Sequence, residues 1–425
     1  MFEISAVLLT LAALFAYLNY RFIRLPATIG IMVQAMVLSL LLLLVMHLGD
    51  WPQPLLHGVR YLLRQINFEQ AVFHGMLAFL LFAAALHTDL RDLRSQWITV
   101  MLLATVGVMV STFMIGAMVY GALSVLGLQI DYIYCLLFGA LISPTDPIAV
   151  FGILRSVHTP RQLEIIITGE SLLNDGISVV LFLVLLQIAR RIEPVSAKEV
   201  ALLLGREILG GAMLGLVAGT LYYRLIKHID RYPVEVLMTL SLATGSYALA
   251  DSLGFSGPIA VVLAGLVIGN LGRSQAMSDQ TRANLDTFWE LVDDALNAVL
   301  FLLIGLGMLM MSFTRWHLLA GVAALPIVLL ARLLTVGPII TVLGRWKQFS
   351  PGTILLLTWS GMRGGISVAL ALAIPVDLKR ERPILVVMTY AVAIFSILVQ
   401  GLTIGPLVKR LIKRREDHAK VEQVQ

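Results

Sequence analysis

The segment 163–189 combines an apolar composition with a stripe of polar side chains. It is long enough to cross a bilayer as a helix, which takes about 20 residues. At about 100° per residue, five polar side chains fall within roughly 140° of arc, namely Glu170, Ser171, Asn174, Asp175 and Ser178. Ionisable groups at membrane depth are costly and usually face a bundle interior or a water-filled path. The stripe therefore predicts either an ion site or a structural ion pair buried between helices.

A further carboxylate, Asp146, stands between Pro144 and Pro147 in the apolar segment 132–154. Each proline removes a backbone donor and disfavours the helical conformation of the residue before it. We expect the helix to unwind there in mid-membrane and to leave nearby carbonyls without partners, which is tolerated only inside protein or beside a cavity. Asp146 could neutralise the positive N-terminal end of a half-helix.

Two arginines lie in other apolar segments. Arg363 stands in the run SGMRGG, residues 360–365 of segment 351–375, whose three glycines loosen the helix. Arg332 is embedded in segment 317–343. Arginine stays protonated, so each of the two can pair permanently with a carboxylate.

Charge balance then singles out one carboxylate. Three deep carboxylates face two guanidiniums, so one negative site remains if both arginines pair. That site must bind a proton or a cation to be tolerated in a low-dielectric interior. We expect Glu170 to pair with Arg363, and Asp146 to be held by the unwound segment, with or without an arginine. Asp175 is left as the exchanging group.

Oxygen ligands for an alkali cation surround this group. They are the Asp175 carboxylate, the Ser171 hydroxyl and the hydroxyl or carbonyl of Thr145, and hard cations prefer such oxygens. A carboxylate that takes either a proton or a cation produces obligatory exchange. With one such carboxylate, the exchange is electroneutral and one-for-one.

Composition assigns the chain to the polytopic membrane proteins. It has 425 residues, of which 59% are hydrophobic and 13% charged, whereas a soluble chain is about 45–50% apolar and about 25% charged. The net charge of +5 does not indicate a nucleic-acid partner. The basic cluster after the last apolar segment is typical of a topology anchor on anionic lipid.

Apolar segments predict an all-α fold of about thirteen transmembrane helices. The predicted spans are 4–20, 29–48, 71–87, 97–126, 132–154, 163–189, 200–226, 234–250, 257–271, 295–311, 317–343, 351–375 and 383–411. The distribution of Lys and Arg between loops favours an external N-terminus and a cytoplasmic C-terminus in the cell (inner) membrane. Residues 1–412 then form one transmembrane domain, and 413–425 a short charged cytoplasmic tail.

The two predicted breaks fall in the fifth and twelfth spans, seven spans apart. Pairing spans 1–6 with spans 8–13 places both breaks at corresponding positions in opposite orientations. This is the inverted-repeat pattern of secondary transporters, with the site where the broken helices cross. We expect the core to be built around spans 5, 6 and 12.

Four stretches resemble the signature segments of the NhaP/NHE-type monovalent cation/proton antiporters. They are SPTDPIAV, GESLLNDGISVVLF, SGPIAVVLAGLVIGN and GMRGGISVALAL, and the resemblance extends over nearly the whole chain. It implies an NhaA-like fold, with a mobile six-helix core and a dimerisation domain, assembled as a homodimer. It implies Na⁺/H⁺ exchange, extending to Li⁺, for pH and sodium homeostasis, without a cofactor.

The resemblance also implies roles for individual residues. Asp175 would be the transporting carboxylate and Asn174 the structural half of an Asn-Asp pair, where electrogenic relatives have Asp-Asp. The resemblance assigns Ser171, Thr145 and Asp146 to the ion site. It assigns Glu170 and Arg363 to a stabilising ion pair.

One departure from the family pattern leaves cation selectivity open. Many relatives have a Glu or Asp where this chain has Ala83. K⁺/H⁺ exchange on the same scaffold is therefore the nearest alternative. A cation channel is remote because no repeated filter is visible. An enzyme is disfavoured because the stretch after Gly169 lacks the second glycine of a G-x-S-x-G elbow. Without a P-loop, the ion gradient itself must drive transport.

Overall fold

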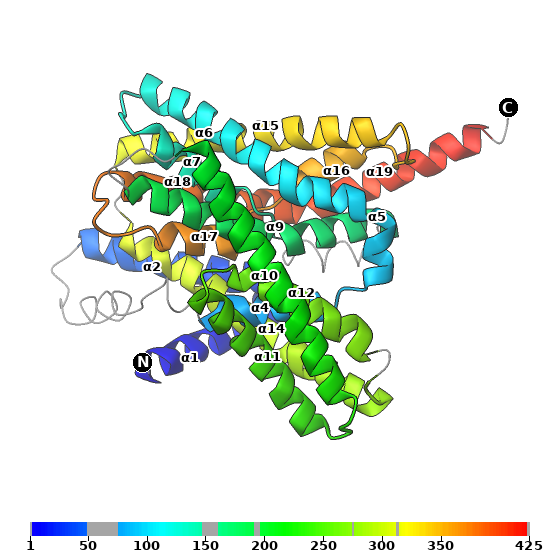
Figure 1. Ribbon diagram of the computed structural model, residues 1–425. Coiled ribbons are helices and arrows are strands. Elements are labelled where there is room, and N and C mark those ends of the chain that lie inside the picture. The colour runs from blue at the N-terminus through cyan, green and yellow to red at the C-terminus, as the bar shows by residue number, and fades with distance from the viewer. Residues whose placement is uncertain are drawn as a thin grey trace. The chain divides into compact units, whose positions relative to one another are not determined.

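The structure, a computed structural model, describes residues 2–48, 75–146, 160–190, 196–273, 276–311 and 314–422. Every regular element in these ranges is a helix (Figure 1). Among them, seven helices are long and apolar enough to cross a membrane, and three further apolar helices are shorter. The predicted all-α polytopic class is confirmed. Each of the thirteen predicted spans overlaps a helix, although thirteen as a count of membrane crossings stays a prediction.

The chain divides into two compact units, each made of two stretches of sequence. Unit 1 comprises Met1–His87 and Gly211–Thr314, and unit 2 comprises Thr88–Gly210 and Arg315–Gln425. The residues of one helix, α10 (Ala197–Ile226), are shared between the two.

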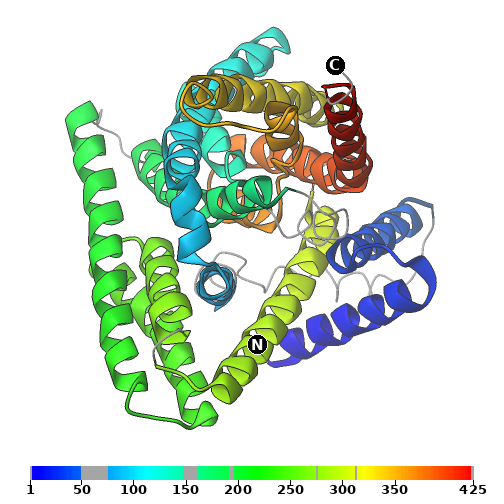
Figure 2. The same cartoon turned by 90° about the vertical axis from the view of Figure 1, so that its right-hand side faces the viewer.

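Unit 1 is organised around a long helix, α14. Its helices are α1 (Phe2–Leu18), α2 (Ala27–Leu48), α4 (Leu77–Leu86), α11 (Tyr232–Ser252), α12 (Gly257–Val267) and α14 (Asp279–Gly307). The α14 helix lies between the pair α1–α2 and helix α11 (Figure 2). It begins sixteen residues before the predicted span 295–311, because Ser278 caps it and accepts from Thr281 N. The predicted span thus overlaps the apolar C-terminal part of a longer helix, whose amphipathic first part begins at the Ser278 cap.

Unit 2 contains all the charged residues singled out above. Its helices are α5 (Leu90–Leu102), α6 (Val108–Val125), α7 (Tyr132–Ile142), α9 (Arg161–Arg190), α15 (Arg315–Leu343), α16 (Thr353–Trp359), α17 (Gly365–Leu372), α18 (Glu381–Phe395) and α19 (Gly401–Glu422). The π-helical turns η3 (Leu103–Gly107) and η6 (Ser396–Gln400) join α5 to α6 and α18 to α19. Helix α7 packs against α6 and α9, and α15 packs against α6, α16 and α18.

Both predicted breaks are present in unit 2. Helix α7 ends at Ile142, and 143–146 are not helical. Helix α16 ends at Trp359, and α17 begins only at Gly365 (Figure 1). Pro147 and the rest of the predicted span 132–154 lie outside the described residues. Helix α19 continues to Glu422, into the predicted tail 413–425.

Candidate ion site

The two breaks contact each other through the backbone and one arginine. The amide of Asp146 donates to the carbonyl of Met362 at 2.8 Å. Arg363 Nη1 donates to the carbonyls of Ser143 and Pro144 at 2.9 and 3.0 Å. In an uninterrupted helix the Ser143 carbonyl would accept from residue 147, but proline has no N–H. A buried guanidinium therefore replaces the donor that the proline removes.

The carboxyl group of Asp146 lies against Gly364, the residue directly before α17. A Cβ built on Gly364 would overlap the Asp146 carboxyl carbon and Oδ2. Only glycine leaves room for the carboxylate at this position. The carboxylate thus lies at the N-terminal end of α17, where the helix dipole favours negative charge.

Gly364→Ala is therefore expected to displace Asp146 and to reduce the transport rate at least about 100-fold, because misplacing a functional group by about 1 Å can cost that much. Gly337→Ala is the matched control, because a Cβ on Gly337 of α15 has no neighbour within 4 Å. Transport rates of the two variants in proteoliposomes check this expectation. Equal rates for both variants would contradict it.

Each polar group of the unwound residue Thr145 forms a hydrogen bond with a side chain of helix α9. Asn174 Nδ2 donates to Thr145 Oγ1 at 2.9 Å, and Asn174 Oδ1 accepts from the Thr145 amide at 3.4 Å. Ser171 Oγ donates to the Thr145 carbonyl. All three residues are at most 5% exposed. The structure therefore brings Thr145, Ser171 and Asn174 together, with both ends of the Asn174 amide engaged.

Asp175 follows Asn174 on the same helix and is 8% exposed. The charge of Asp146 acts on it across the site. None of the hydrogen bonds described above for Thr145, Ser171 and Asn174 involves the Asp175 carboxylate. Asp175 thus combines burial, proximity to a second carboxylate and an available pair of oxygens.

The predicted pairing of Glu170 with Arg363 is wrong, because Glu170 pairs with Arg332. Arg332 Nη2 lies 2.8 Å from Glu170 Oε2, and Nη1 bonds Oε1, so the pair is bidentate. Arg332 Nε and Nη2 also donate to the Leu357 carbonyl, at 3.3 and 3.2 Å. Gly361 provides the space, since a Cβ there would lie 2.6 Å from Arg332 Nε. The buried pair links α9, α15 and α16.

Sequence reasoning did not identify three of the contact residues. Ser143 and Met362 contribute carbonyls, and Gly364 contributes space. The prolines signalled the first of these, because the carbonyl that loses its donor is four residues before Pro147. No local signal marks Met362, since its carbonyl acquires a partner only where the two breaks meet.

Comparison with known proteins gives a consistent result. The family described as "Sodium/hydrogen exchanger, transmembrane" matches residues 9–410. The chain is 49% identical over 416 residues to the Na(+)/H(+) antiporter NhaP of Pseudomonas aeruginosa, covering 97% of each chain. It is 38% identical over 359 residues to the Na(+)/H(+) antiporter NhaH of Halobacillus dabanensis, covering 83% of this chain and 86% of the relative.

A solved structure shares the fold. The sodium proton antiporter MjNhaP1 of Methanocaldococcus jannaschii at pH 8 superposes with a TM-score of 0.75. The match covers 96% of this chain and 97% of the other, at 20% sequence identity.

Proposed function

Since this chain belongs to the sodium/hydrogen exchanger family and exchanges Na⁺ for H⁺ across a membrane, we propose that Asp175 carries both ions in turn, one for one. The observation that carries this proposal is the arrangement of the charges in unit 2. Glu170 is bound by Arg332, and Asp146 lies at the N-terminal end of α17, whereas neither of these contacts involves Asp175. It is the carboxylate available to a proton or a cation.

Competition for this carboxylate produces the exchange. Protonated Asp175 is neutral, and so is Asp175 with a bound Na⁺, whereas the empty form leaves a negative charge in a buried place. Moving an isolated charge into a low-dielectric interior is costly. The protein therefore changes the side of the membrane to which the site opens more readily when the site is occupied than when it is empty. This couples Na⁺ movement in one direction to H⁺ movement in the other.

We assign the Na⁺ ligands to oxygens of Asp175, Ser171 and Thr145. Ser171 Oγ and the Thr145 carbonyl are already in contact, and each oxygen retains a lone pair. Asn174 holds Thr145 by both ends of its amide, which supports a structural role for it. Because Asn174 is neutral, only one residue of the Asn-Asp pair titrates, which supports the electroneutral branch of the family.

The composition of unit 2 supports a six-helix core built from two inverted repeats. It holds the helices of predicted spans 4–6 and 11–13, and these two sets are seven spans apart. We propose that unit 2 is the mobile core and that unit 1 supplies the dimerisation domain of a homodimer in the cell membrane. The N-terminus would be external, and the C-terminus, at the end of α19, would be cytoplasmic.

Potassium/proton exchange is the second candidate function. Oxygen ligands do not exclude K⁺. Ala83, which stands where many relatives have a carboxylate, is buried in α4 of unit 1. Its effect on selectivity stays a prediction.

Proteoliposomes with an imposed pH gradient separate these functions. We expect added Na⁺ to dissipate the gradient at a rate that does not change with an imposed membrane potential, because one charge replaces one charge. Dissipation by K⁺ alone would replace the proposed substrate. A strong potential dependence would require a second proton carrier, and single-channel currents would indicate a channel.

A further inference from the structure

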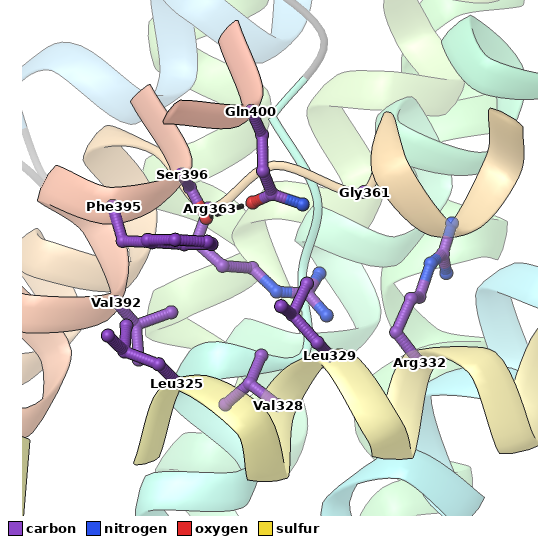
Figure 3. A pocket seen from close by; sticks show the side chains of 10 residues that line it. All are labelled: Leu325, Val328, Leu329, Arg332, Gly361, Arg363, Val392, Phe395, Ser396 and Gln400. Carbon is purple, nitrogen blue, oxygen red and sulfur yellow. Dashed lines mark hydrogen bonds between the residues drawn. The ribbon is translucent and has the colours of Figure 1, made fainter. Parts of the chain in front are cut away.

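A small cavity in unit 2 lies between the break at 360–364 and helices α15 and α18 (Figure 3). The cavity offers about 10 Å³ to a water molecule, which is room for about one water. Its polar lining consists of Arg332, Arg363, Ser396 and Gln400. The exchange mechanism above uses neither Ser396 nor Gln400, although both are buried.

The amide of Gln400 has one chemically permitted orientation. Ser396 Oγ donates to Gln400 Oε1 at 2.6 Å (Figure 3). Gln400 Nε2 donates to the Trp359 carbonyl at 3.1 Å. Because a carbonyl can only accept, the nitrogen end must face Trp359. The π-helical turn Ser396–Gln400 presents both side chains, and such turns are frequent at functional sites.

This hydrogen bond satisfies the end of a half-helix. Trp359 is the last residue of α16, so its carbonyl is among those that a helix leaves without an internal partner. The residue that would donate to it in a continuous helix is Arg363, which lies in the break. Gln400 therefore takes the place of a backbone donor lost at the break.

The same cavity reaches the guanidinium that joins the two breaks. Arg363 Nη1 bonds the carbonyls of Ser143 and Pro144. Arg363 lines the cavity, and its Nε is buried and has no acceptor among the described residues. Gln400 retains one amide hydrogen and one oxygen lone pair. A single water can accept from Arg363 Nε and donate to Gln400 Oε1.

We propose that Gln400 is a positioning residue for the exchange site. It holds Trp359 directly and Arg363 through one water, and thereby fixes the direction in which Arg363 meets the unwound segment 143–146. Gln400 itself touches no transported ion. The inference rests on the proposed function, because it concerns the geometry of the same ion site.

Gln400→Met tests the inference, since methionine has a similar size and flexibility but cannot replace either hydrogen bond. We expect the apparent KM for Na⁺ to rise roughly 10–100-fold, as for other residues that orient ion ligands, with a much smaller change in kcat. Gln34→Met is the matched control. Gln34 Nε2 also donates to two helix carbonyls, those of Phe15 and Gly30 at 2.9 and 3.0 Å, but in unit 1. Its KM should be unchanged.

Ser396→Ala provides a second measurement that does not depend on the folding of the first variant. It leaves the Trp359 bond intact and removes the donor that fixes Gln400 Oε1, so we expect a smaller rise in KM. Unchanged KM in Ser396→Ala and in folded Gln400→Met would overturn the inference, as would an equal rise in Gln34→Met. If wild type exchanges Na⁺ and Asp175→Asn does not, these results leave the proposed function standing. Exchange retained by Asp175→Asn would overturn the proposed function instead.

Discussion

Replacing Asp175 with asparagine is expected to reduce Na⁺/H⁺ exchange to the background of empty liposomes while the protein stays folded. The amide has nearly the same shape, but it neither takes up a proton nor balances a cation. Asp175 is 8% exposed, so the substitution also removes a buried negative charge, whose burial is costly. Melting in detergent should therefore be unchanged or higher. Dissipation of a pH gradient on adding Na⁺ measures the loss.

Asp92→Asn is the control for this variant. Asp92 lies in α5 of the same unit and pairs with Arg161 at 2.5 Å, with 33% of the Asp92 side chain and 76% of the Arg161 side chain exposed. Exposed pairs contribute about 0–1 kcal/mol, so this variant should exchange at the wild-type rate. Substantial Na⁺-dependent exchange by Asp175→Asn would assign the transported proton to another group.

Arg332→Met is expected to cause the largest loss of stability. It leaves Glu170 buried without its bidentate partner, and removing one member of a buried pair typically costs about 3–5 kcal/mol. The side chains of Arg332 and Glu170 are 8% and 2% exposed, so water cannot readily replace the lost partner. The melting temperature in detergent should fall clearly, and exchange should fall with it.

A second-site substitution shows which arginine is the partner. Glu170→Gln removes the charge that Arg332→Met leaves unpaired, so the double variant should regain much of the lost melting temperature. The same Glu170→Gln change should not rescue Arg363→Met, because Arg363 bonds the carbonyls of Ser143 and Pro144. Rescue of Arg363→Met alone would favour the predicted pairing of Glu170 with Arg363.

Local chemistry explains why much of the fold could be predicted from the sequence. An apolar segment of sufficient length indicates a membrane helix whatever its neighbours. Prolines on both sides of Asp146 predict a break because the missing donors belong to the chain itself. The glycines around Arg363 predict the second break because glycine loosens a helix, and both breaks are present.

Local rules were less successful at helix ends. Helix α14 begins at Asp279, well before the predicted span 295–311, and α19 continues to Glu422. Both extensions are polar and carry charged residues, which a search for apolar segments cannot distinguish from loops. The extension of α14 begins at the Ser278 cap, and the extension of α19 continues an existing helix.

The residues of the ion site could be predicted, but not their partners. Helical periodicity places Ser171, Asn174 and Asp175 on one stripe of α9 before any tertiary contact is known. Counting charges shows that one carboxylate must remain without an arginine. The count does not show which arginine pairs with which carboxylate. The sequence alone thus determined which ionisable groups lie in apolar segments, and that the three carboxylates could not all pair with two arginines.

Only the tertiary structure decided which groups meet. Arg332 reaches Glu170 because α15 packs against α16, and because Gly361 in the break after α16 leaves space for the guanidinium. Arg363 is directed instead to the carbonyls of the other break, and Asp146 to the space over Gly364. Ion pairs and carbonyl contacts act over a few ångströms between segments far apart in the chain, so their choice of partner follows from helix packing. Helix packing is a property of the whole fold, and for that reason no local pattern specifies it.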